Sequence, residues 1–134
     1  MSPRRSAWLD QAHNDLAMAE LAAANGFHAQ ACFFASQTAE KALKSLLIEL
    51  GAVPPRSHVL PALVAELAGL GLDTAVLEGL RLNGLSRMAT SSRYPEDDTP
   101  PQHLFDAVDA DEAIATARAV LAFADLDPAG PPPV

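Results

Sequence analysis

Cysteine and long hydrophobic stretches are both nearly missing from this sequence. The single cysteine, Cys32, excludes a disulfide within the chain and disfavours a zinc site built from thiolates. No segment reaches the roughly 18 consecutive apolar residues that span a bilayer. The first residues, which include Arg4, Arg5 and Asp10, do not resemble a signal peptide. We therefore expect a soluble, cytoplasmic protein that does not enter a membrane.

Positive charge is also scarce. The chain has 9 Lys and Arg against 17 Asp and Glu, which gives a formal net charge of −8. Nonspecific affinity for nucleic acid comes from clustered Lys and Arg, so the charge argues against a broad phosphate-binding surface. Any contact with a nucleic acid must be local. A glycine-rich phosphate loop, a nucleophile elbow and paired metal ligands are missing as well, so the sequence predicts neither a metal nor a cofactor.

What the sequence does contain is helical pattern. Hydrophobic residues make up 49% of the chain, and most of them are Ala and Leu. Apolar residues recur at spacings of three and four, and Gly, Pro and capping residues separate the segments. Five helices are predicted: about 6–25, about 27–50, one capped by Ser57, one capped by Asp73 or Thr74 and continuing past Met88, and one opened by Asp109. We expect an all-α, antiparallel up-and-down bundle of four to five helices.

The boundaries of this bundle follow from composition. Residues 95–105 are acidic and rich in proline, which indicates a surface loop. Asp109 and Glu112 have the spacing of a capping box that opens the last helix. Residues 127–134 contain four prolines and a glycine, so we expect one domain over residues 1–126 and a disordered tail over 127–134.

A local cluster of positive charge interrupts the acidic sequence. Arg81, Arg87 and Arg93 lie in a stretch between Glu78 and Glu96 that has no acidic residue. A guanidinium binds phosphate in a planar, bidentate manner, so one interpretation is an anion site. The alternative is that these arginines favour the dipole of a helix C-terminus and pair with the acidic residues that follow.

Polar residues also follow one edge of the second predicted helix. Gln37, Lys41 and Lys44 share that edge, and Glu40 is placed to pair with Lys44. The lysines would add charge to an anion pocket if the fourth helix packed alongside. We expect instead that Glu40 and Lys44 form an exposed ion pair worth well under ~1 kcal/mol.

The remaining candidates are isolated groups. The four histidines include no pair at metal-ligand spacing, but His58 and His103 are candidates for a general base, against the alternative of ordinary surface histidines. Asp15 is either a buried carboxylate that orients an arginine or a residue at the solvent edge of its helix. Cys32 is expected to be a small buried hydrophobe.

Several segments together resemble the HEPN family of small helical domains: Trp8-Leu9 with Asp15-Leu16, the block from Gln37 to Lys44, Ser57-His58-Val59-Leu60, and Ser92-Arg93-Tyr94-Pro95. The resemblance spans about residues 6–125. It implies a helical bundle, usually dimeric, that is associated with nucleotide binding and is often encoded beside a minimal nucleotidyltransferase in a toxin–antitoxin pair. Some members are metal-independent ribonucleases with a histidine a few residues after an arginine, whereas here nine residues separate Arg93 from His103.

The resemblance implies a ligand site, whose Lys and Arg side chains would hold phosphate oxygens while Tyr94 stacks on a base or donates a hydrogen bond and His58 contacts ribose or phosphate. Its members are Lys41, Lys44, His58, Arg87, Arg93 and Tyr94. The favoured function is a dimeric, noncatalytic module that binds a nucleotide or nucleic-acid phosphate and acts with a nucleotidyltransferase partner. The alternatives are a metal-independent ribonuclease toxin using Arg93 and His103, and a purely structural oligomerisation subunit. An enzyme is the less favoured class.

Overall fold

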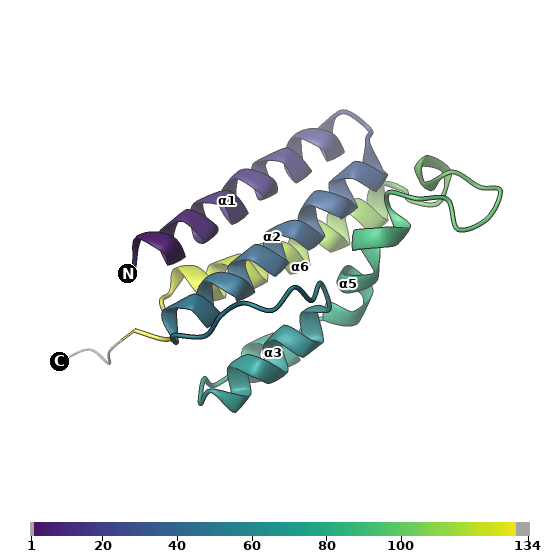
Figure 1. Cartoon of the computed structure of the whole chain (residues 1–134). Helices are drawn as coiled ribbons and strands as arrows, with labels where there is room; N and C mark the ends of the chain where they lie inside the picture. The colour runs from purple at the N-terminus through teal and green to yellow at the C-terminus, as the bar shows by residue number, and fades with distance from the viewer. Residues whose placement is uncertain (1, 131–134) are drawn as a thin grey trace.

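Helices account for all the regular structure in the computed structural model, which describes residues 2–130 (Figure 1). The elements are α1 (Pro3–Ala24), α2 (His28–Glu49), α3 (Leu60–Gly69), α4 (Ala75–Glu78), α5 (Leu82–Ser91), the 3-10 turn η1 (Pro101–His103) and α6 (Ala107–Asp125). No strand occurs within the described residues, and the predicted all-α bundle is confirmed.

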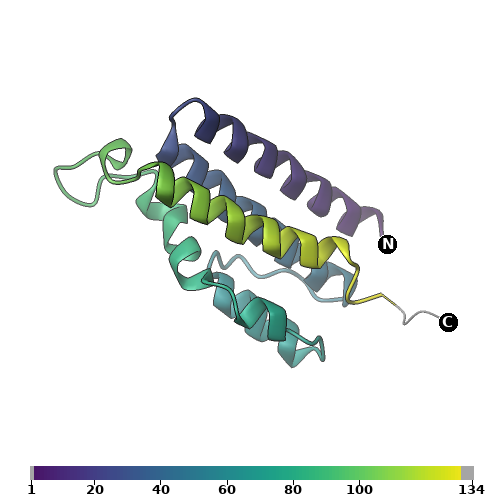
Figure 2. The same cartoon turned by 180° about the vertical axis from the view of Figure 1, so that it is seen from behind.

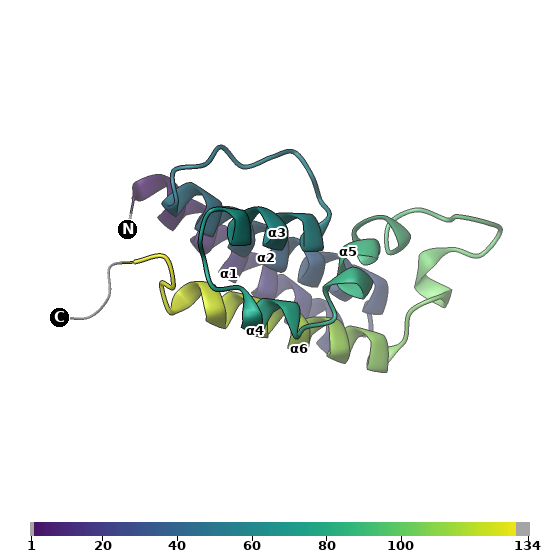
Figure 3. The same ribbon diagram turned by 90° about the horizontal axis from the view of Figure 1, so that it is seen from below.

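The three long helices form the body of the bundle. α1 and α2 make an antiparallel hairpin, and α6 packs against both (Figures 1 and 2). α3, α4 and α5 cover the remaining side of the body, and α3 and α5 both contact α2 (Figure 3). α2 is therefore the central helix, and it is buried on nearly all sides, with Leu43, Leu46 and Leu47 fully enclosed.

A glycine follows the C-terminus of each helix in the α1–α2 hairpin, as the sequence predicts. Gly26 has φ +80° after α1 and Gly51 has φ +83° after α2, a conformation that costs glycine little. α1 begins earlier than predicted, because Ser2 caps it by accepting a hydrogen bond of 3.1 Å from the N–H of Arg5. Pro3 then occupies the first turn, where its missing N–H costs nothing.

The predicted fourth helix is wrong as a single element, since the structure divides it into α4 and α5. Leu77 and Leu82 are both buried in the core. In one continuous helix these two residues would point about 140° apart, and only one of them would face the core. The break after Gly79 allows both leucines to be buried.

The start of the last helix also differs from the prediction. Asp106, not Asp109, is the N-cap residue of α6. The Asp106 carboxylate accepts the N–H of Asp109 at 2.9 Å, and the Asp109 carboxylate accepts the N–H of Asp106 at 2.9 Å. The bond from the Asp109 N–H is the main reason that the pKa of Asp106 is lowered. The predicted capping box, Asp109 with Glu112, lies three residues after the real one. It was misplaced because the real box has an aspartate, Asp109, at the third helical position, where glutamate is usual.

Residues 127–130 form a turn after α6, and the rest of the predicted tail, residues 131–134, lies outside the described residues. Between residues 2 and 130, no helix has the length and apolar character needed to cross a membrane.

Candidate functional site

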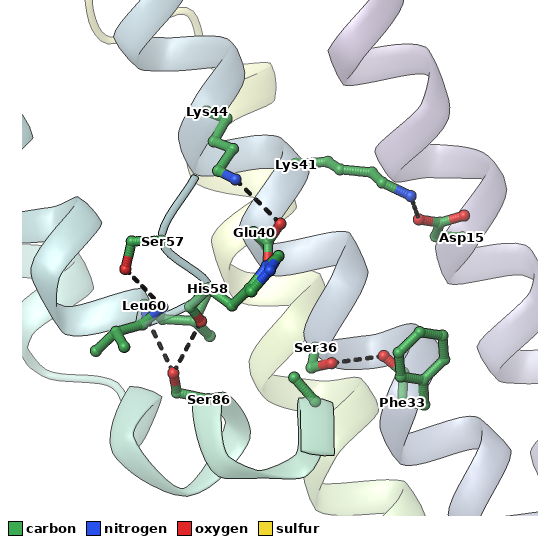
Figure 4. Close-up of polar contacts among 12 residues, drawn as sticks. Asp15, Phe33, Ser36, Glu40, Lys41, Lys44, Ser57, His58, Leu60 and Ser86 are labelled. Atoms are coloured by element: carbon green, nitrogen blue, oxygen red, sulfur yellow. Dashed lines mark hydrogen bonds and ion pairs between the residues drawn. The ribbon is translucent and has the colours of Figure 1, made fainter. Parts of the chain in front are cut away.

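The side of α2 that faces α3 and α5 carries a buried carboxylate, Glu40. Its Oε2 atom lies 3.2 Å from Nζ of Lys44, and its Oε1 atom lies 2.8 Å from Nδ1 of His58 (Figure 4). Glu40 and Lys44 are both buried, so the prediction of an exposed ion pair is wrong. The reason is that the connection between α2 and α3 folds back along α2 and brings His58 onto Glu40 (Figure 4).

The backbone of His58 is fixed by α5. The Ser86 hydroxyl donates to the His58 carbonyl at 3.1 Å and accepts the N–H of Leu60 at 2.9 Å. The predicted cap at Ser57 is wrong, because Val59 is the N-cap residue of α3 and Ser57 accepts the N–H of Val59. Ser86 therefore satisfies the first N–H of α3 from a different helix. The His58 side chain nevertheless remains 69% exposed. Its ring is held at one nitrogen and is open to solvent over most of its surface.

Lys41 does not belong to this group. Its Nζ bonds Oδ2 of Asp15 on α1, and Gln11 donates to Oδ1 of the same carboxylate at 3.0 Å. Figure 4 shows Lys41 directed toward α1 and away from Glu40. Asp15 is therefore a buried carboxylate, as one of the two interpretations held, but its cationic partner is a lysine and not an arginine.

The guanidinium of Arg93, just beyond α5, lies over two aromatic rings. Its guanidinium carbon lies 4.7 Å from the centre of the Phe33 ring and 5.0 Å from the centre of the Tyr94 ring. Its Nε donates to the carbonyl of Ala89 at 2.8 Å. Tyr94 is 55% exposed, which leaves this stack open to solvent. Sequence patterns gave no sign of the contact with Phe33, which lies sixty residues earlier.

The group around Glu40 and the group around Arg93 both contact α2, at two positions along that helix. Phe33 to Glu40 is seven residues on α2, and Arg93 back to Ser86 is seven residues on the α5 segment. The two segments run antiparallel, and seven residues correspond to about 10 Å along a helix. We call the line of residues Lys44, His58, Arg93 and Tyr94, which these contacts connect to α2, the α2/α5 strip.

The three predicted arginines do not form one cluster. Arg87 is exposed on α5 directly after Ser86, whereas Arg81 precedes α5 and lines a different cavity of about 450 Å³ between α3, α4 and α5. Within residues 2–130 none of the three makes an ion pair with Glu96 or its acidic neighbours, so the expected pairing is not found there.

The other candidate groups lie apart from the strip. His103 is exposed in η1, and over the described range no hydrogen bond or ion pair joins it to Arg93. Cys32 is fully buried in the core, as predicted, and burial raises the pKa of its thiol to about 12. No group of three or more possible metal ligands is present among the residues that the structure describes.

Comparison with known proteins gives the family. The model of the HEPN domain matches residues 6–126, nearly the whole folded chain. The chain belongs to the HEPN domain family. Two crystal structures have the same fold. TT1696 from Thermus thermophilus is 30% identical with a TM-score of 0.80, covering 93% of this chain and 98% of that one. ST0689, an archaeal HEPN homologue, is 30% identical with a TM-score of 0.76, covering 96% and 99%. No curated protein matches significantly.

Of the six ligand residues that the HEPN resemblance implied, four lie on the strip, and Arg87 is exposed on α5 with no side-chain contact to them among residues 2–130. Lys41 is directed to α1 instead. Lys44 already has Glu40 as a counter-charge, so it adds little positive field. One exposed guanidinium group, one exposed tyrosine and one oriented imidazole remain on the strip: Arg93, Tyr94 and His58.

Proposed function

We propose that this HEPN domain binds a nucleotide, or the phosphate of a nucleic acid, along the α2/α5 strip and catalyses no reaction. The observation that carries the proposal is the Arg93 guanidinium held against the rings of Phe33 and Tyr94. These contacts and the Nε bond to Ala89 restrain the guanidinium. Its terminal nitrogens have no hydrogen-bond acceptor among residues 2–130, so they are free to bind phosphate oxygens in a bidentate manner.

The surroundings of Arg93 favour a small ligand over a long polymer. Arg87 adds a second exposed guanidinium on α5, and the hydroxyl of the exposed Tyr94, next to Arg93, can donate a hydrogen bond to the same phosphate. Glu96, Asp97 and Asp98 follow at once and repel an extended phosphate backbone. A mononucleotide or one short RNA segment satisfies both conditions.

The proposal includes a homodimer that acts with a minimal nucleotidyltransferase in a toxin–antitoxin type of system. Membership of the HEPN family supports this part, and no contact within the chain bears on it. Light scattering measures the dimer directly. Co-expression with a nucleotidyltransferase encoded beside the gene, followed by purification through a tag on either protein, tests the partner. Two separate proteins in that experiment would remove the partner from the proposal.

Calorimetric titration with ATP and GTP tests the binding. We expect binding that weakens at least about tenfold in Arg93→Ala, because a charge-assisted pair contributes about 1.5–3 kcal/mol. Arg118→Ala is the matched control, since it removes the same charge from an exposed arginine that pairs with Glu20 on α1. Absence of heat with every nucleotide would overturn the proposal, and an equal loss in both variants would mean that only net charge matters.

The same protein variants test the two alternative functions, a ribonuclease and a purely structural subunit. The ribonuclease alternative is not favoured, because His103 lies in η1 without a described contact to Arg93. Incubation with total RNA in the absence of metal should leave the RNA intact; cleavage that is lost in His58→Ala or His103→Ala would establish the enzyme. A purely structural subunit would remain dimeric in Arg93→Ala and bind no nucleotide.

A further inference from the structure

The bond between Glu40 and His58 fixes which nitrogen of the imidazole carries a proton. An ionised carboxylate has no hydrogen to donate, so His58 Nδ1 must be the donor across the 2.8 Å that separates it from Glu40 Oε1. The second carboxylate oxygen is occupied by Lys44, at 3.2 Å. Lys44 also supplies the positive charge that a buried carboxylate needs, so Glu40 does not require a second cation from the histidine.

The ring nitrogen of His58 that Glu40 leaves free is therefore Nε2. In the neutral ring the nitrogen that carries no proton is an acceptor, and here that nitrogen belongs to the exposed part of the side chain. An acceptor does not bind the oxygens of an ionised phosphate, which have no hydrogen to offer. It binds a group that donates, such as a hydroxyl.

We propose that Glu40 is a positioning residue that holds His58 in the Nδ1–H tautomer, so that Nε2 accepts a hydrogen bond from a ribose hydroxyl of the bound nucleotide. This inference rests on the proposed function, in which Arg93 binds phosphate. His58 bonds Glu40 on α2 whereas Arg93 lies over Phe33, seven residues earlier on the same helix, so the two contacts are separate, and an acceptor nitrogen at His58 favours the sugar hydroxyl over a second phosphate. The site would discriminate against a nucleotide that lacks this hydroxyl.

Glu40→Gln tests the positioning role, because it changes hydrogens and leaves the shape almost unchanged. Lys44 can only donate, so it retains the single amide oxygen of the new side chain. The amide NH2 group then faces His58 Nδ1, which must become an acceptor. The proton of the neutral ring moves to Nε2, and the ligand-facing atom changes from acceptor to donor.

Nitrogen NMR of the histidine rings at about pH 8, where a histidine ring in water is neutral, measures this without any ligand. We expect Nδ1–H for His58 in the unchanged protein and Nε2–H in Glu40→Gln, with circular dichroism confirming that the variant is folded. An Nε2–H ring in the unchanged protein would overturn the positioning role. If Glu40→Gln does not fold, the unchanged protein and His58→Ala, which alters a largely exposed side chain, still decide the inference.

Calorimetric titration with ATP, 2′-deoxy-ATP and 3′-deoxy-ATP measures the ribose contact. We expect one deoxynucleotide to bind about five- to tenfold more weakly than ATP, the size of one net hydrogen bond of about 1 kcal/mol. His58→Ala should remove this difference by weakening ATP and the deoxynucleotide that keeps the contacted hydroxyl, and His103→Ala should preserve it. Equal affinity for all three nucleotides would overturn the ribose contact while the proposed function stands. No binding of any nucleotide would overturn the proposed function itself, and the ribose contact with it.

Discussion

Arg5 and Asp127 form an ion pair of 2.7 Å that ties the first turn of α1 to the turn after α6. The Arg5 side chain is fully buried, and its Nη2 also donates to the carbonyl of Ala124 at 2.9 Å. The guanidinium thereby binds one of the last carbonyls of α6 and places a positive charge at the negative end of that helix dipole. The two ends of the described fold are joined by one side chain.

Replacing Arg5 with Met should lower the free energy of unfolding by about 2–3 kcal/mol, because the Ala124 carbonyl loses its charged donor. Asp127→Asn should cost less than about 1 kcal/mol, since that carboxylate is 41% exposed and asparagine tolerates the left-handed φ of +52° found there. Urea denaturation of both variants measures the two values. Equal costs would show that the ion pair, and not the carbonyl, carries the stabilisation.

Lys41 should matter for stability and not for ligand binding. Lys41→Met leaves the buried Asp15 carboxylate with only Gln11 as a donor, and we expect a loss of about 2 kcal/mol. Adding Asp15→Asn should recover part of that loss, because the uncompensated charge disappears. The nucleotide affinity of Lys41→Met should equal that of the unchanged protein in calorimetric titration. A decrease like that of Arg93→Ala would return Lys41 to the ligand site.

The thiol of Cys32 predicts a loss of stability in alkaline solution. Burial, followed by the charges of Asp109 and Asp106, raises its pKa from 9.0 to about 12. An unfolded chain releases this proton near pH 9.0 and the folded chain only near pH 12, so the free energy of unfolding should fall as the pH rises between the two. Below pH 9.0 the contribution is complete. Urea denaturation at a series of pH values measures this dependence, and Cys32→Ala should lack this part of the decrease. If the free energy of unfolding fell equally with pH in both proteins, the prediction would be contradicted.

Ser86 should control the order of the connection before α3. Ser86→Ala removes both bonds of the hydroxyl and leaves the Leu60 N–H without its acceptor, at an expected cost of about 1–2 kcal/mol. Hydrogen exchange should accelerate at residues 58–60. Ser91→Ala is the control, because that hydroxyl bonds only to Arg87 in the same helix. Matching exchange rates in the two variants would mean that the connection is held in another way.

Arg93→Lys separates stacking from charge. Lysine keeps the positive charge but lacks the planar fork and the flat face that lies against Phe33 and Tyr94. We expect a loss of nucleotide affinity of about tenfold, whereas Arg87→Lys should change affinity by less than about threefold, because the Arg87 guanidinium lies over no aromatic ring among residues 2–130. Unchanged affinity of Arg93→Lys in the titration would show that a point charge at this position is sufficient.

Local signals along the chain predicted most of the fold. Gly26 and Gly51 ended their helices where expected, because a left-handed residue is needed there and glycine supplies it. The failures arose where a tertiary demand overrode a local pattern. α4 and α5 separate so that Leu77 and Leu82 can both be buried, and periodicity alone cannot weigh that gain against a broken helix.

The candidate site was predicted in part, for a similar reason. Helical spacing places Glu40 beside Lys44 whatever covers them, so the pattern predicts the pair but not its burial. The contact with His58 spans 18 residues and depends on the path of the connection between α2 and α3. The contact of Arg93 with Phe33 depends on the direction of α5, which no local pattern encodes.

The acidic residues beyond Arg93 should affect the rates at which a nucleotide associates and dissociates. A nucleotide approaching this protein meets the field of a net charge of −8 and, close to the strip, the carboxylates of Glu96, Asp97 and Asp98. Salt screens this repulsion over a distance of about 8–10 Å, so added salt should speed association. The same salt weakens the contact with Arg93 and should speed dissociation. Binding measured only at equilibrium would conceal both effects, because they shift the affinity in opposite directions.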